Sequence, residues 1–501
     1  MRQVKDRPSR PSENSLSKHR QYLSGFAYPG KDISAKPLQW LSLRMAVFFI
    51  MITGSLLVFM GGCTPQTRSV SLAVDTTQTF SRGGTQEVPV KWWRVFGDED
   101  LNILVDSALA SNFNLQTAWQ RLREAQAVVD RESGSFFPTV DASVQGEISQ
   151  YQSQFVQDQQ LSLGLTSGYE VDLWGRISSR VQARRYREQA TREDYMTAAL
   201  SVSAEVTRVY YQLVQAQREL SLIREQVRTN EKVLTLLETR FGSGQIRSVD
   251  ILRQEQLLES TREQEINAEA RVEVLKHQLS VLLGNPPQQS ITAAEGHLPD
   301  LPPLPETGVS TDLIRRRPDI QSAFNRLKAA DREVASAISS RYPRLSLTAS
   351  ASTAADNARD LFQDWSRRVA GNLLTPLFYG GQLKAEVDRT QAVKKQRLYE
   401  YGQTVLNAFR EVEDALIREE KQKQTIQSIR QQLELARQSY EQLRIEYFNG
   451  MSGYLDVLTA LDEQQQLRRD LLSARLGLLE YRIALYRSLA GGFEVESMTN
   501  E

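Results

Sequence analysis

The chain has 501 residues with 61 basic and 61 acidic side chains, so it carries no formal net charge at neutral pH. This balance lacks the basic excess typical of nucleic-acid binding. The hydrophobic content of 40% is too low for a helical membrane protein, and the single cysteine excludes an intrachain disulfide. The sequence contains no phosphate-binding glycine loop, nucleophile elbow or metal-ligand cluster, so we expect no metal, no non-covalent cofactor and no enzymatic activity.

The N-terminal region has the pattern of a lipoprotein signal peptide. Arg44 precedes an apolar run over residues 45–60, which is short for a membrane span. Two glycines and Cys63 follow, and this sequence resembles a bacterial lipobox, in which the cysteine becomes the acylated first residue. We therefore predict a covalent lipid on Cys63, and Thr64 after it fits sorting to the outer membrane. The alternative is an uncleaved anchor helix with an incidental cysteine.

Four segments alternate apolar and polar residues with the period of a strand. They cover about residues 139–148, 161–173, 345–351 and, with poorer alternation, 369–378. Such alternation over about 10 residues is typical of transmembrane β-strands, with the apolar side toward lipid. A soluble hairpin with one buried face would show the same pattern, and alternation alone does not separate the two interpretations.

Two very long helices are predicted. Residues 176–241 contain neither glycine nor proline, and one unbroken helix of this length would measure roughly 100 Å. The second helix, about residues 382–448, has Gly402 as its only glycine. It repeats the spacing of core positions found in the first helix, with interruptions at Glu419 and Gln422. Core positions in the first helix follow steps of 3 and 4, which indicates lateral packing as in a coiled coil: Val206, Val209, Leu213, Ala216, Leu220, Ile223, Val227, Asn230, Leu234, Leu237 and Phe241.

The second half of the chain repeats the first at an offset of 205 to 206 residues. Phe137-Pro138 recurs as Tyr342-Pro343, and Asp250-Ile251-Leu252 recurs as Asp456-Val457-Leu458. Each long helix leads into a glycine-containing turn and a returning helix, the first of which covers about residues 248–283 with Ser248 as its predicted N-cap. The predicted segments are 1–62 (extension and signal peptide), 63–95 (lipid-anchored tether), 96–284 (first repeat), 285–310 (proline-rich linker), 311–492 (second repeat) and 493–501 (tail).

Four membrane strands in one chain form an open sheet, whose edges would leave backbone groups unsatisfied in lipid. Closure therefore requires further chains. Two chains give eight strands with a lumen filled by side chains, and three give twelve, which is enough for a pore. The sequence favours an oligomeric channel continued by a helical tube, with its narrow end at the two glycine turns.

These features resemble the TolC-like outer-membrane efflux proteins, and the lipobox resembles their lipoprotein branch. The motifs are Arg316-Arg317-Pro318-Asp319-Ile320, the aromatic-proline pair before each hairpin, residues 376–381, and Gly450 with Asp456-Val457-Leu458. The resemblance covers about residues 92–492. It implies a mainly α chain forming a trimeric 12-stranded β-barrel continued by a long α-helical barrel.

The resemblance also implies a location and partners. It places the protein in the outer membrane with its helices in the periplasm, as a passive exit duct for drugs or other small molecules. The implied partners are a periplasmic adaptor, an inner-membrane pump and outer-membrane lipid, and no nucleic acid. Two alternatives stay open, namely a duct for type I protein secretion and a non-conducting coiled-coil scaffold. The transported substrate cannot be read from the sequence.

In that family, acidic residues and hydrogen bonds near the turns control the aperture. Asp456 matches an aperture position, and Tyr447 with Asp250 fits a tyrosine–aspartate lock. Thr459 stands where a second acidic residue is common, and Ser452 stands where a basic lock residue is expected. The alternative is that Asp250 and Asp456 only favour the first turns of their helices through the helix dipole.

Overall fold

The computed structural model describes residues 79–85, 87–150, 157–288, 298–307 and 310–490. Cys63, the predicted signal peptide and the first part of the predicted tether lie outside the described residues. Within the described ranges, no helix combines the length and apolar character needed to cross a membrane.

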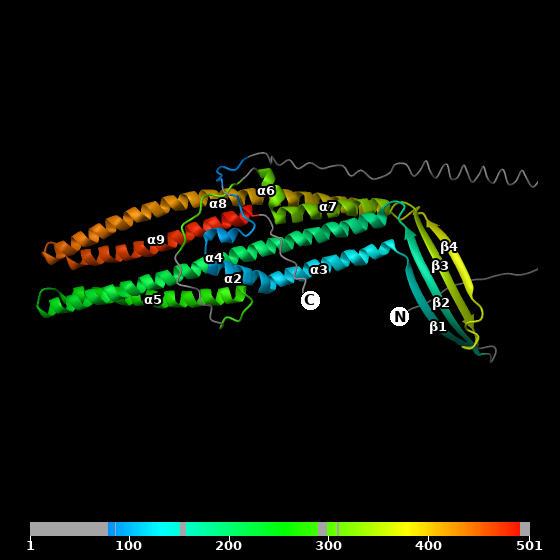
Figure 1. The fold of residues 1–501 in the computed structure, drawn as a ribbon, viewed down its shortest axis with the longest axis horizontal. Helices are drawn as coiled ribbons and strands as arrows, with labels where there is room; N and C mark the ends of the chain where they lie inside the picture. Colours follow the sequence, from blue (N-terminus) through cyan, green and yellow to red (C-terminus); the bar gives the residue numbers. More distant parts are fainter. Residues whose placement is uncertain (1–78, 86, 151–156, 289–297, 308–309, 491–501) are drawn as a thin grey trace, which may run out of the picture. The chain divides into compact units, whose positions relative to one another are not determined.

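Apart from the short helix η2, the order of helices and strands is the same in both halves of the chain (Figure 1). A short helix η1 (Trp92–Phe96) precedes the first half. That half contains α2 (Glu99–Ser111), α3 (Phe113–Ser133), η2 (Gly134–Phe136), β1 (Thr139–Gln150), β2 (Gln157–Val171), α4 (Arg176–Gly242) and α5 (Ser248–Leu282). The second half contains α6 (Ser310–Arg316), α7 (Pro318–Ser339), β3 (Arg344–Ala355), β4 (Ser366–Leu374), α8 (Gln382–Phe448) and α9 (Tyr454–Leu489). The observed structure therefore repeats as the sequence offset predicts.

The two long helices were predicted closely. The first was expected to end at Phe241 and ends at Gly242, while the second has the predicted bounds. α4 packs against α3, α5, α7 and α9, and α8 packs against α7 and α9, so the two halves interleave. This packing buries most of the predicted seam along one side of α4, which stabilises a helix with little apolar content. The prediction of Phe241 as a core position was wrong, because α4 ends at the following residue and the Phe241 side chain is 47% exposed.

The starts of α3 and α5 are capped differently. Asn112 caps α3, because its side-chain oxygen accepts hydrogen bonds from the backbone N–H groups of Asn114 and Leu115. The prediction that Ser248 caps α5 was wrong. Arg247 occupies the cap position and makes no side-chain cap bond, while Ser248 is the first helical residue.

The four strands form one antiparallel sheet in the order β1-β2-β3-β4. The register places Ala142, Leu165, Ala351 and Arg367 in one row, and the next row along β3 pairs Ser350 with Thr166 and Arg368. Successive side chains point to opposite faces. One face is consequently mainly apolar, with Arg367 among its exceptions, and the other is mainly polar.

The bounds predicted for the fourth strand, about residues 369–378, were wrong. β4 begins at Ser366 opposite Ser352 and ends at Leu374 opposite Arg344. It starts earlier because backbone pairing with β3 extends to polar residues that precede the first apolar one. It ends earlier because β3 begins after Pro343, and Pro376 has no N–H to donate to a ladder.

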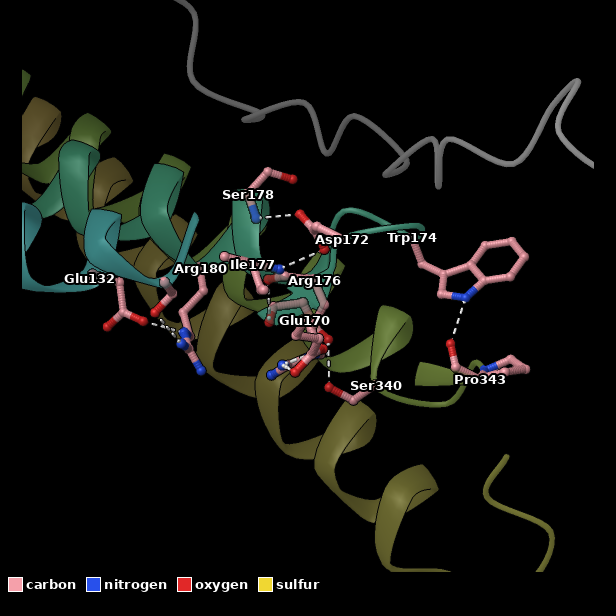
Figure 2. A network of polar contacts seen from close by, with 12 residues as sticks. Glu132, Glu170, Asp172, Trp174, Arg176, Ile177, Ser178, Arg180, Ser340 and Pro343 are labelled. Carbon is pink, nitrogen blue, oxygen red and sulfur yellow. Dashed lines mark hydrogen bonds and ion pairs between the residues drawn. The ribbon is translucent and has the colours of Figure 1, made fainter. Parts of the chain in front are cut away.

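Polar contacts fix the passage from β2 into α4 (Figure 2). The Asp172 carboxylate accepts hydrogen bonds from the backbone N–H groups of Ile177 at 2.9 Å and Ser178 at 2.7 Å, so it caps the helix. The Trp174 indole N–H donates to the carbonyl of Pro343 at 2.8 Å, and Glu170 pairs with Arg176 at 2.7 Å. These bonds connect the start of α4 to β2 and to the residue that precedes β3.

The largest core surrounds η1. Trp92 stacks on Tyr486 of α9 at a ring-centroid distance of 5.9 Å, and Phe96 meets Tyr211 of α4 edge-on at 5.5 Å. Trp92 and Trp93 are fully buried. The aromatic side chains of η1 thus fill the space between α4 and α9, about midway along α4.

Candidate aperture at the helix turns

The two turns that follow the long helices lie together. The α4–α5 turn covers residues 243–247 and the α8–α9 turn covers residues 449–453. Gly244 and Gly450 adopt φ angles of 72° and 74°, a left-handed conformation that suits glycine. One apolar cluster joins the turns, with Leu237, Tyr454 and Val457 buried at its centre and these residues around them: Val233, Ile246, Ile251, Tyr440, Leu443, Tyr447 and Leu458.

Asp250 lies in the first turn of α5 and is only 5% exposed. The Arg247 guanidinium is 3.6 Å from its Oδ1 atom, but this arginine side chain is itself 75% exposed. Within the described part of the chain, Oδ1 of Asp250 accepts no hydrogen bond. A buried carboxylate oxygen therefore keeps free acceptor capacity beside the turn.

Tyr447 lies near Asp250 without bonding to it. Its hydroxyl group makes no hydrogen bond with any residue in the described ranges, so the predicted Tyr447–Asp250 bond does not form within one chain. Burial raises the pKa of Tyr447, the Arg240 guanidinium lowers it and the Asp250 carboxylate raises it. The two groups are close enough to interact, and their role as a lock between neighbouring turns stays a prediction.

Asp456 is exposed and caps α9. Its Oδ2 atom accepts hydrogen bonds at 3.3 Å from both the Gly453 N–H and the Ser452 hydroxyl. Thr459 is exposed on the same helix, and its hydroxyl donates to the Leu455 carbonyl at 2.9 Å. Asp456 therefore has a structural role at the helix start, and its predicted aperture role would be an additional one.

Sequence reasoning missed Tyr454, the first residue of α9. Its hydroxyl donates to Oε1 of Gln254 on α5, and its side chain is 4% exposed. Burial raises the pKa of Tyr454, and the nearby groups of Tyr447, Tyr440 and Asp250 raise it further. The sequence signal was an aromatic residue in a polar turn, at the position that corresponds to Ser248 in the first repeat.

A duplicated chain of this kind, with a four-stranded two-faced sheet and two long helical hairpins, has the architecture of an outer-membrane channel protein. The family model for outer membrane efflux proteins matches both halves, at residues 104–285 and 309–491. The chain belongs to this family. It is an outer-membrane protein with its helical part in the periplasm, and the resemblance to TolC-like efflux proteins is confirmed.

Individual relatives agree with the family match. The chain is 28% identical to the pyoverdine export outer membrane protein OpmQ of Pseudomonas aeruginosa over 464 residues, covering 89% of this chain and 96% of that protein. It is 25% identical to the cation efflux system protein CusC of Escherichia coli K12 over 408 residues, covering 80% and 88%. The open-state MtrE outer membrane channel of Neisseria gonorrhoeae superposes with a TM-score of 0.78 at 26% identity, covering 86% and 98%.

Proposed function

We propose that three copies of this chain form an outer-membrane channel that acts as the passive exit duct of a tripartite efflux system for drugs or other small molecules. The observation that carries this proposal is the sheet with two unpaired edges. Within the described residues, β1 pairs only with β2 and β4 only with β3. Unpaired backbone groups are strongly destabilising in lipid, so the sheet needs other chains to close.

The number of chains follows from the size of the pore. Three chains of four strands give a 12-stranded barrel, whereas an eight-stranded barrel is filled by its own side chains. Edge β4 of one chain would meet edge β1 of the next, and such head-to-tail contacts form a closed ring. Exposed apolar side chains also lie near the ends of both edge strands. Phe137 before β1 is 70% exposed, and Leu377 and Phe378 after β4 are 91% and 89% exposed.

The two faces of the sheet support insertion as a barrel. Val140, Val144 and Ile148 of β1 lie on the apolar face and are 70%, 77% and 67% exposed. A sheet face with so many exposed apolar side chains is stable only when it contacts lipid or another apolar surface. The opposite face, which includes Asp141 and Glu147, would then line a wet lumen.

The proposed partners are a periplasmic adaptor and an inner-membrane pump. The relatives carry names that refer to export of pyoverdine and efflux of cations, which supports an efflux role without indicating one substrate. We propose no cofactor other than a covalent lipid on Cys63. The pump would select the substrate, so the genes beside this one would separate small-molecule efflux from protein secretion.

Two measurements on the purified protein test the proposal. Chemical cross-linking in detergent should stop at three chains, and reconstitution into planar bilayers should give discrete channel conductance. Leu165→Pro is a suitable control, because it removes a ladder bond from central strand β2 and should abolish assembly. A monodisperse monomer that retains its sheet, or an inserted trimer without conductance, would contradict the proposal.

A further inference from the structure

The two edge strands of the sheet carry charges of opposite sign. β1 contains Asp141 and Glu147 and no basic residue, whereas β4 contains Arg367 and Arg368 and no acidic residue. All four side chains are exposed, and within the described residues none of them forms an ion pair. Each edge of the sheet therefore offers unpaired charges of the sign that the other edge lacks.

Three of these charges lie on the polar face of the sheet. The register places Asp141, Thr166, Ser350 and Arg368 in one row, so the side chains of Asp141 and Arg368 point to the same side. Glu147 shares this face, because residues an even number of positions apart on a strand point the same way. In a closed barrel this face lines the wet lumen, where two charged side chains can pair without entering lipid.

The tilt of the strands determines where Arg368 would meet the next chain. Barrel strands tilt by about 40°, lie about 4.8 Å apart and rise about 3.4 Å per residue. Across the four strands of one chain, a row perpendicular to the strands is therefore displaced by roughly 16 Å along the strand direction, which is about five residues. The displacement must be even, because side chains that share a row point to the same face.

This displacement brings Glu147 of the next chain close to Arg368. The row that contains Asp141 and Arg368 continues to Gln145 or Glu147 on β1 of the next chain. A displacement in the opposite direction would reach residues 135–137, which precede the first residue of β1, Thr139. Glu147 thus lies directly opposite Arg368 or at the adjacent diagonal position, and a long side chain reaches both.

We propose that Arg368 of one chain pairs with Glu147 of the next chain at each joint of the barrel, and that this pair specifies head-to-tail closure of β4 on β1. The inference rests on the proposed channel function, since it requires chains that join at their edge strands. Contact between two β1 edges would bring carboxylates together, and contact between two β4 edges would bring guanidinium groups together. Like charges on paired strands are destabilising and opposite charges are stabilising, so β4 prefers β1 to a second β4.

The pair acts on assembly more than on stability. An ion pair that faces water contributes little to the free energy of folding, because solvent screens both charges. Charge complementarity between two surfaces mainly raises the rate of correct encounter and disfavours wrong partners. The helical part of the single chain makes no use of Arg368 or Glu147, so its folding should not depend on them.

The central test is a charge swap. Wild-type chains unfolded in urea are returned to detergent, and the fraction of trimer is followed over time by chemical cross-linking. Arg368→Glu and Glu147→Arg should each slow trimer formation several-fold and lower its yield, whereas the double variant Arg368→Glu/Glu147→Arg should recover most of both. Sodium chloride at about 1 M should narrow the difference, because it screens exposed charges. Wild-type assembly in both single variants, or no recovery in the double variant, would overturn the inference.

Asp141→Arg supplies the matched control. Asp141 lies on the same face of the same edge strand as Glu147, six residues away, which corresponds to about 20 Å along the strand. The double variant Arg368→Glu/Asp141→Arg has the same net charge as the charge swap, but it should assemble no better than Arg368→Glu alone. Equal recovery in both double variants would show that total charge, and not this pair, controls assembly, and the inference would fail.

Cross-linking at defined positions tests the register without altering the charge balance between the edges in opposite ways. In a Cys63→Ser background, Arg368→Cys combined with Glu147→Cys should give covalent oligomers with a short bifunctional maleimide. Arg368→Cys combined with Asp141→Cys should give few. The reverse preference would overturn the proposed register and the pair with it. A wild-type chain that stays a monomer would overturn the channel function as well, whereas a wild-type trimer whose assembly ignores the charge swap would overturn this inference alone.

Discussion

The buried pair of Arg482 and Glu419 offers the sharpest test of how the helical part is held together. Their side chains are 1% and 2% exposed, and two parallel hydrogen bonds of 2.7 and 2.8 Å join α9 to α8. Nη1 of Arg482 also donates to the carbonyls of Pro302 and Pro303 at 2.7 and 3.1 Å. One arginine thus connects both helices of the second hairpin to the linker between the repeats.

We predict that Arg482→Met lowers the free energy of unfolding by about 3–5 kcal/mol, the usual effect of leaving one buried charge without its partner. Lys423 would remain 2.7 Å from Glu419, but this lysine is 52% exposed and compensates weakly. The double variant Glu419→Leu/Arg482→Met removes both charges. It should recover at least about 2 kcal/mol of the loss, with the remainder due to the two proline carbonyls that lose a donor.

Urea unfolding in detergent would measure these differences, and double-mutant analysis would give the coupling between the two residues. Limited proteolysis after Glu306, which is exposed in the linker, should become faster in both variants because the linker loses its anchor. Equal destabilisation of the single and double variants would show that the charge pair is not the cause. Unchanged proteolysis would refute the anchoring of the linker.

The same pair predicts a pH dependence. Burial raises the pKa of Glu419, but hydrogen bonds and charge from Arg482 and Lys423 outweigh burial, and the net pKa lies below its ordinary value of 4.5. The stabilisation from this pair is therefore fully present above pH 4.5 and is lost as the pH falls through the lowered pKa. The stability difference between the wild type and the double variant should shrink in that acidic range and stay constant near neutrality.

Three further predictions concern the lipid, the aperture and the sheet. Radioactive palmitate should label the wild type and not Cys63→Ser, and equal labelling would exclude Cys63 as the acylated residue. Asp456→Ala and Asp456→Asn should both reduce cation selectivity and divalent block in bilayer recordings, because rings of carboxylates select cations. Unchanged selectivity in both would leave Asp456 as a helix cap only. Val369→Arg, on the apolar face of β4, should lower barrel stability by about 2–4 kcal/mol, whereas Ala370→Arg on the polar face should be tolerated, and similar effects in both would contradict the assignment of the faces.

The sequence predicted the long helices well because their signals are local. A stretch without glycine or proline from Arg176, with core residues every 3.5 positions from Val206, defines α4 with little help from other segments. The bounds of β4 were predicted poorly because its polar residues Arg367 and Arg368 belong to the strand only through pairing with β3. Strand ends are set by a partner strand, and a single segment does not contain that information.

The polar interruptions of the helix seams show where sequence reasoning stopped at the candidate site. Glu419 and Gln422 break the seam of α8, and in the structure Glu419 pairs with Arg482 while Gln422 donates to the Ala474 carbonyl at 2.8 Å. Asn230 stands in the seam of α4 in the same way, and its partner Gln465 lies 235 residues further along the chain. A polar residue at a core position thus indicates that a buried partner exists. Only the packing of distant helices identifies that partner, which is why these polar residues were visible in the sequence and their partners were not.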